Sequence, residues 1–201
     1  MRTCKNNKEC ILNHVSNDYE KRLLKTISPV IKGIKPAEII SLPKSEENVR
    51  GKLKLLTTMY NNCSKIKGEI INYSSKSIKI FIYNEYALQK ILHKKNIRNF
   101  LATCGYSPSY SLEDCLDKLF SRISMGKIPD EIGIFLGYPL KDVMGFMGVV
   151  NLPLTKVNYW RIYGDANISD RLYDNIQKVK HHTEKLLVHK TPQQVFELLI
   201  S

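Results

Sequence analysis

The spacing of apolar residues predicts that helices make up much of the first half of the chain. Helical spacing recurs in four segments, at residues 7–31, 45–63, 85–93 and 97–104. Ser45 precedes two glutamates, so it is the expected N-cap of the second segment. Residues 36–43 begin and end with proline and are predicted to be a turn-like connection.

The apolar pattern changes from helical to alternating between residues 69 and 83. Residues 69–73 and 77–83 are rich in isoleucine and tyrosine and flank a Ser-Ser-Lys sequence, which predicts a β-hairpin. Because two strands alone would be only marginally stable, we expect residues 157–163 to supply a third strand. The predicted fold class is therefore α+β, with several helices packed around a small antiparallel sheet made of hairpin 69–83 and strand 157–163.

Capping residues predict where the helices of the second half begin. Ser111 is followed three residues later by an aspartate, which is the spacing of a capping box. Asp165 is the expected N-cap of a long helix, on which Ile168 is predicted to face inward. Thr191 and Gln194 have capping-box spacing at the start of the last helix.

Length and composition are those of one globular domain. The chain has 201 residues, of which 43% are hydrophobic and 25% charged. We expect a single domain over residues 1–201, with residues 1–8 as a flexible tail. No apolar run approaches the ~20 residues of a membrane helix, and the N-terminus lacks the apolar region of a secretory signal. We therefore expect a cytoplasmic protein with no membrane partner.

The net charge of +12 makes nucleic acid a partner to consider. The positive charge is spread over the N-terminal half, largely as lysine, and forms no arginine-rich run, so nucleic acid is not the favoured partner. The five cysteines are odd in number and match no zinc or redox spacing. Three histidines near the end of the chain, His181, His182 and His189, lack a carboxylate or cysteine at matching spacing. We predict no metal and no cofactor.

Residues 129–165 combine glycines with aromatic and charged residues. Half of the chain's ten glycines lie there, which indicates sharp bends or a close approach of the backbone to another group. Aromatic side chains can form flat pocket walls, and an arginine can bind a carboxylate or phosphate through two hydrogen bonds. We therefore expect a domain that binds a small ligand or a protein partner through this segment. The candidate binding residues are Glu131, Tyr138, Asp142, Trp160, Arg161, Tyr163 and Asp165.

The same residues also have a structural interpretation, which the sequence favours. Asp142 and Arg161 can form an ion pair that only holds the fold together. Tyr138, Trp160 and Tyr163 can pack in the core, with their polar tips hydrogen-bonded.

A helix-turn-helix unit is predicted inside this segment, with helices at 129–136 and 139–147 around a turn at Gly137. A DNA-binding regulator is therefore an alternative function. A recognition helix has to present polar side chains to base edges and cations to phosphates. The second helix offers one lysine and one aspartate on an otherwise apolar surface, so burial of this helix is favoured over DNA recognition.

An enzyme is the third hypothesis, with Asp130 or Glu131 as a general acid or base. Neighbouring residues on a helix point about 100° apart, which disfavours a shared site for the two carboxylates. The chain contains no nucleophile elbow, phosphate-binding loop, dinucleotide fingerprint or zinc-protease motif.

Two motifs in this segment, EIGIFLGYPLKDVMGF and YWRIYGD, resemble the signature of an uncharacterised family of cytoplasmic proteins from clostridia and related anaerobic Firmicutes. The resemblance extends upstream through IRNFLATCGY and SLEDCLDKLFSRI and covers roughly residues 30–175. It implies no activity, cofactor or catalytic residue.

Overall fold

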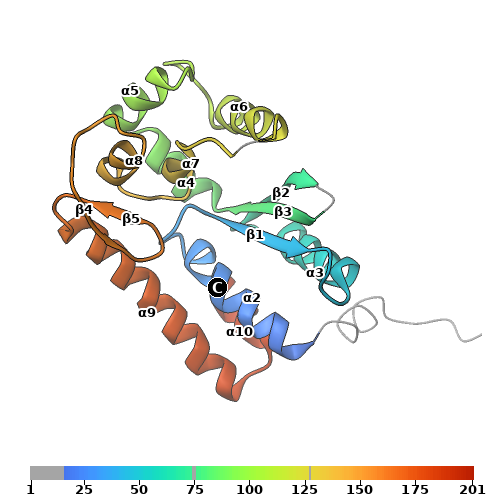
Figure 1. The fold of residues 1–201 in the computed structure, drawn as a ribbon. Helices are drawn as coiled ribbons and strands as arrows, with labels where there is room; N and C mark the ends of the chain where they lie inside the picture. The colour runs from blue at the N-terminus through green and yellow to red at the C-terminus, as the bar shows by residue number, and fades with distance from the viewer. Residues whose placement is uncertain (1–15, 74–75, 127) are drawn as a thin grey trace, which may run out of the picture.

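A three-stranded antiparallel sheet organises the computed structural model, which describes residues 16–73, 76–126 and 128–201. The sheet has the strand order β1-β3-β2, formed by Ala37–Pro43, Ser77–Tyr83 and Lys67–Tyr73 (Figure 1). The predicted hairpin is confirmed as β2 and β3, and the α+β class is confirmed with it. The tail expected at residues 1–8 lies outside the described residues.

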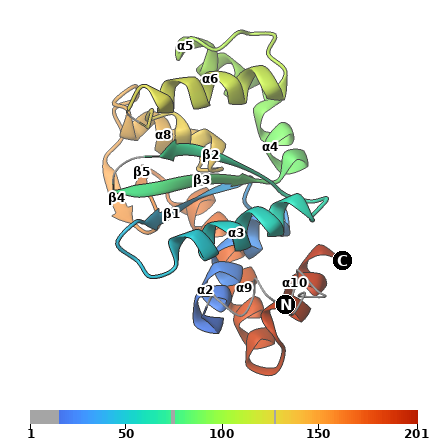
Figure 2. The ribbon, with the colours of Figure 1, turned by 90° about the vertical axis from the view of Figure 1, so that its right-hand side faces the viewer.

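The sheet separates two apolar cores because neighbouring residues of its central strand point to opposite faces. Ile78, Ile80 and Ile82 pack on one side, with α2 (Asn17–Ile31), α3 (Val49–Asn61), α10 (Pro192–Ile200) and the end of α9 (Asn167–His189). Phe81 and Tyr83 pack on the other side, with α4 (Glu85–Leu92), α5 (Lys95–Thr103) and α6 (Leu112–Ser124). Figure 2 shows α6 and α3 on opposite faces of the sheet.

The third strand is not the predicted one. Residues 37–43, expected to be a turn-like connection, form β1 and pair along their full length with β3. Pro43 ends an edge strand, where a missing N–H leaves no ladder hydrogen bond unmade, so proline marks the edge of the sheet here and not a turn. Residues 157–163 do not join this sheet. They belong to a separate hairpin of β4 (Leu154–Val157) and β5 (Arg161–Tyr163).

Two of the four predicted N-caps are confirmed, and two are wrong. Ser111 and Thr191 each form a complete capping box. Ser45 is not the N-cap of α3: Asn48 has that position, with a left-handed φ of 53°, and accepts a hydrogen bond from the Gly51 N–H. Asp165 lies one residue before the N-cap of α9 and accepts a hydrogen bond from the Asn167 N–H at 3.0 Å.

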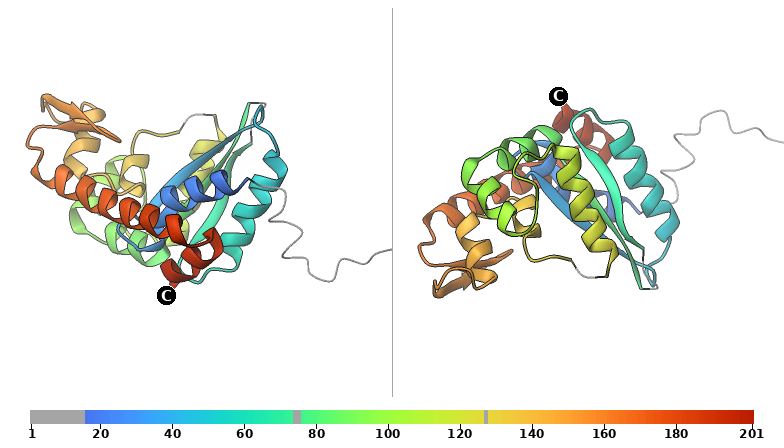
Figure 3. Two further views of the ribbon diagram at one scale, coloured as in Figure 1. Left: turned by 90° about the horizontal axis from the view of Figure 1, so that it is seen from below. Right: turned by 90° about the horizontal axis from the view of Figure 1, so that it is seen from above.

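The glycine-rich segment forms one end of the molecule. It contains α7 (Ile132–Phe135), α8 (Leu140–Phe146) and the β4–β5 hairpin, beside the start of α9 (Figures 1 and 3). Gly137 has a φ of +84°, and a Cβ there would lie 2.4 Å from Pro36, so this turn packs directly against the residue before β1. No helix among the described residues is both long enough and apolar enough to span a membrane.

Candidate functional site

The carboxylate of Asp142, in the first turn of α8, is 1% exposed and accepts four hydrogen bonds. Oδ1 accepts from the Lys141 ammonium at 2.6 Å and the Tyr163 N–H at 2.9 Å. Oδ2 accepts from Trp160 Nε1 at 2.8 Å and Ser169 Oγ at 2.6 Å. We call these five residues the Asp142 cluster. The cluster joins α8, the β4–β5 hairpin and α9 through one side chain.

Burial alone would raise the pKa of Asp142. The hydrogen bonds from Lys141, Ser169, Tyr163 and Trp160 outweigh burial and hold the pKa of the carboxyl below its ordinary value. Asp142 is therefore an ionised acceptor whose oxygens are occupied by other parts of the chain. The ion pair considered between Asp142 and Arg161 does not form, because Lys141 supplies the counter-charge at 2.6 Å.

The aromatic candidates pack against one another. Tyr138 and Trp160 stack with their ring centroids 4.7 Å apart. The ammonium of Lys35, which pairs with Glu38 at 2.8 Å, lies 5.6 Å from the Tyr138 ring. Burial, followed by the negative charge of Glu38, raises the pKa of Tyr138 to about 12. The stack therefore connects the glycine-rich segment to β1, in agreement with the packing interpretation of these two side chains.

Arg161 and Asp165 lie at the surface, apart from the Asp142 cluster. The guanidinium of Arg161 lies 5.6 Å from the Phe146 ring, and no carboxylate of the described residues is within 4.0 Å of it. Asp165 accepts the Asn167 N–H. Of the seven predicted residues, Asp142, Trp160 and Tyr163 come together in the cluster, and Tyr138 stacks on Trp160. Glu131 lies elsewhere.

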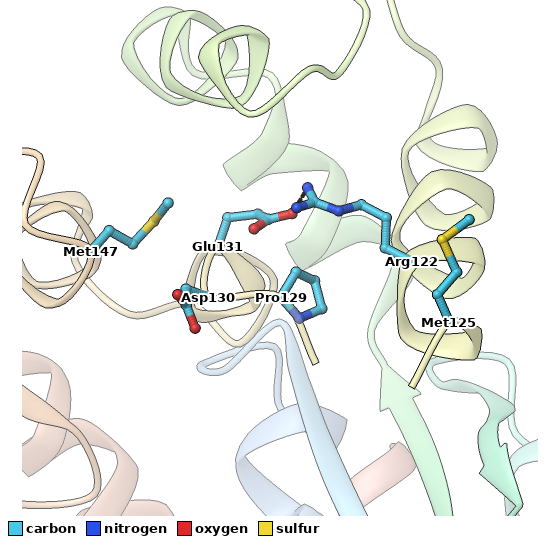
Figure 4. A pocket seen from close by; sticks show the side chains of 6 residues that line it. All are labelled: Arg122, Met125, Pro129, Asp130, Glu131 and Met147. Carbon is cyan, nitrogen blue, oxygen red and sulfur yellow. Dashed lines mark hydrogen bonds and ion pairs between the residues drawn. The ribbon is translucent and has the colours of Figure 1, made fainter. Parts of the chain in front are cut away.

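Glu131 borders a hollow of about 300 Å³ that lies between α6 and the end of α8 (Figure 4). Its side chain is 2% exposed, forms an ion pair with Arg122 and accepts a hydrogen bond from the Tyr106 hydroxyl at 3.1 Å. The side chains of Asp130 and Glu131 point in different directions, as expected for neighbours (Figure 4). The other lining residues are Met125, Pro129 and Met147.

Cys104, which lies near Glu131, is not activated as a nucleophile. Burial and the negative charge of Glu131 raise the pKa of the Cys104 thiol, which disfavours a reactive thiolate. Among the described residues, no group of three or more histidine, cysteine, aspartate or glutamate side chains is arranged to hold a metal ion.

Exposed apolar side chains are concentrated between residues 146 and 168, from the end of α8 to the first turn of α9. Of the twelve large hydrophobic side chains exposed among the described residues, six lie within residues 146–168. We call these six the hairpin surface: Phe146, Val149, Leu154, Val157, Tyr159 and Ile168. All four residues of β4 are exposed. Only β5 pairs with this strand, so its other edge has no strand partner among the described residues.

The sequence did not single out this surface. Residues 157–163 were expected inside the main sheet, and Ile168 was expected to face inward, but Ile168 is 56% exposed. The helical spacing of Ile168 cannot predict this exposure, because it depends on where the hairpin packs against α9. The four consecutive exposed residues of β4 also lack the apolar–polar alternation of a half-buried strand.

Comparison with known proteins finds a match to one protein family. A family model described as "Protein of unknown function (DUF3793)" matches residues 23–196. No curated protein matches the chain, and no solved structure does. The clostridial origin suggested by the motifs stays a prediction. Because the family model covers most of the length of the chain, the chain belongs to the DUF3793 family of proteins of unknown function.

Proposed function

We propose that this protein is a partner-binding domain and that the hairpin surface is where a protein partner docks. The observation that carries the proposal is the concentration of exposed apolar side chains in residues 146–168. Scattered single apolar residues are normal on a protein surface, whereas a group of them marks an interaction site. The Asp142 cluster supports this interpretation, because it fixes β5 and the preceding Trp160 to two helices.

A small ligand is less well supported at the predicted residues. Tyr138 and Trp160, the expected pocket walls, fill the space between them by stacking. The oxygens of Asp142 are already occupied by four donors. Arg161 remains exposed beside Phe146, which suits contact with a second protein surface.

Charge indicates the chemistry of the partner. A second copy of this chain would bring the same net charge of +12, and like charges oppose association. Arg161 has no carboxylate within 4.0 Å among the described residues. The partner that fits is therefore a different protein, which presents apolar side chains together with acidic ones.

The two other hypotheses gain no support from the geometry. Lys141 is the one cation of α8, and its ammonium donates to Asp142 and to the Tyr163 carbonyl at 2.7 Å. It is therefore engaged inside the protein and not free for a phosphate. Glu131 is held by Arg122 and Tyr106, which suits a structural role for this carboxylate.

Selection from a displayed library of random peptides tests the proposal. We expect the wild-type protein to enrich peptides that combine apolar and acidic residues. The double substitution Leu154→Ser with Val157→Ser should lower the affinity for the selected peptides at least tenfold, because it removes two exposed apolar side chains.

The matched control is Leu198→Ser with Val188→Ser, which removes the same two residue types from exposed positions outside the hairpin surface. These substitutions should leave peptide affinity unchanged. Equal affinity for all three proteins, or no enriched peptide at all, would overturn the proposal.

A further inference from the structure

Lys180 is a buried cation that has no acidic partner in the part of the chain that the structure describes. It lies on α9 and is 9% exposed. Its ammonium donates a hydrogen bond to the Tyr159 hydroxyl oxygen at 3.0 Å and lies 4.4 Å from the centre of the same ring. No carboxylate of the described residues lies within 4.0 Å of this ammonium. A buried charge without a counter-ion is unfavourable, so this place in the fold suits an added negative charge.

Tyr159 connects this cation to solvent. It lies in the turn between β4 and β5, and 54% of the residue is exposed. Its ring packs against Tyr173 of α9, with centroids 5.6 Å apart. Because the phenolic oxygen accepts from Lys180, its own O–H remains available as a donor.

The surroundings make this hydroxyl a better donor than that of an ordinary tyrosine. Burial would raise the pKa of Tyr159, but the hydrogen bonds from Lys180 and Gln177 and the positive charge of Lys180 lower it below its usual value. The negative charge of Glu38 acts in the opposite direction, but Glu38 is itself paired with Lys35 at 2.8 Å. A donor next to a cation binds an ionised acceptor more strongly than a neutral one.

We propose that Tyr159 and Lys180 form a carboxylate-binding site within the hairpin surface, which anchors an aspartate or glutamate side chain of the partner. In this arrangement the Tyr159 O–H donates to the carboxylate, and the Lys180 ammonium supplies the opposite charge from behind. This inference rests on the proposed docking function.

The Tyr159–Lys180 contact also attaches the hairpin turn to α9. A purely structural contact would change stability when removed, but it would not change which peptides bind. The preference of the protein for an acidic residue over its neutral amide is therefore the readout that separates the two roles.

The experiment compares peptide selection by the wild-type protein and by Tyr159→Phe, which keeps the ring and removes only the hydroxyl. We expect wild-type peptides to carry an aspartate or glutamate at one fixed position, with about tenfold loss of affinity when it becomes asparagine or glutamine. Peptides selected by Tyr159→Phe should keep their apolar residues and lose this acidic position. Near-ultraviolet circular dichroism verifies that the variant is folded.

A parallel selection with Arg161→Gln distinguishes failure of the Tyr159–Lys180 site from failure of the docking function. If the acidic position persists in Tyr159→Phe and disappears in Arg161→Gln, the carboxylate binds to Arg161, and this inference is wrong while the docking function stands. If it persists in both variants, the Tyr159–Lys180 site is likewise excluded. If wild-type protein selects no peptide, both the docking function and this site fail.

Discussion

The Asp142 cluster and the hairpin surface use polar and apolar side chains in opposite ways. In the Asp142 cluster, a buried carboxylate meets four donors, and its polar atoms are satisfied inside the protein. In the hairpin surface, only a few residues away, large apolar side chains face solvent. The difference shows that one segment can provide both a rigid support and the surface that the support presents.

The largest expected loss of stability comes from disrupting the Asp142 cluster. Asp142→Ala would leave the partly buried Lys141 ammonium and the buried Trp160 and Ser169 donors without their acceptor. Breaking a buried charge pair in this way costs about 3–5 kcal/mol of unfolding free energy. Urea unfolding of the full chain measures it. Asp165→Ala, which removes an exposed carboxylate with one hydrogen bond, should cost about 1 kcal/mol or less. Equal losses would refute the distinction between the two acids.

A second, smaller loss is expected at Gly145, where α8 contacts β5. A Cβ on this residue would lie 2.6 Å from Tyr163 Cγ, next to the ring's attachment to the backbone, so the tyrosine cannot simply swing away. Gly145→Ala should destabilise the protein by about 1–3 kcal/mol, the usual range for overpacking. Thermal unfolding with a calorimetric enthalpy checks this. An unchanged or raised stability would mean that α8 and the hairpin are not tightly packed.

The pH dependence of stability tests the ionised state of Asp142. Its pKa in the folded protein lies below the ordinary value, so the unfolded chain binds the proton more readily. The stability that this carboxylate contributes is fully present above the ordinary value and is lost as pH falls through the lowered pKa. The stability advantage of wild type over Asp142→Asn should therefore shrink as pH is lowered from 5 to about 2.5 in a urea series. An advantage that grows over this range would contradict the assignment.

The smallest effect on stability is expected on the hairpin surface. Val157 is 63% exposed, so Val157→Ser should change the unfolding free energy by no more than about 0.5 kcal/mol. Val188→Ser, at 72% exposure on α9, is the matched control and should behave alike in urea unfolding. A loss of several kcal/mol at Val157 alone would show that the hairpin surface is part of the core.

Local features of the fold could be predicted from the sequence. The capping boxes at Ser111 and Thr191 and the hairpin of β2 and β3 depend on residues close together in the chain, and all are confirmed. The third strand could not be found in this way. Residues 37–43 become a strand because β3, more than thirty residues later in the chain, offers them an edge. Prolines at both ends suggested a turn instead.

The candidate site, too, could be predicted only in part, because most of its contacts join residues that are far apart in the chain. Asp142, Trp160 and Tyr163 were identified one by one, but their shared hydrogen bonds depend on the packing of α8 against β5. Ser169 was missed because its acceptor, Asp142, lies 27 residues earlier in the chain. Lys141 was missed although it directly precedes Asp142, because adjacent residues on a helix point about 100° apart and are not expected to pair. Lys180 was missed because its hydroxyl partner is 21 residues away, in the hairpin turn.

Amide hydrogen exchange on the full-length protein, with and without a selected peptide, tests the central claim most directly. The account predicts that the peptide slows exchange within residues 146–168 and leaves the main sheet unchanged. Slower exchange around Arg122 and Glu131 instead, with no change in residues 146–168, would contradict the assignment of the hairpin as the docking surface.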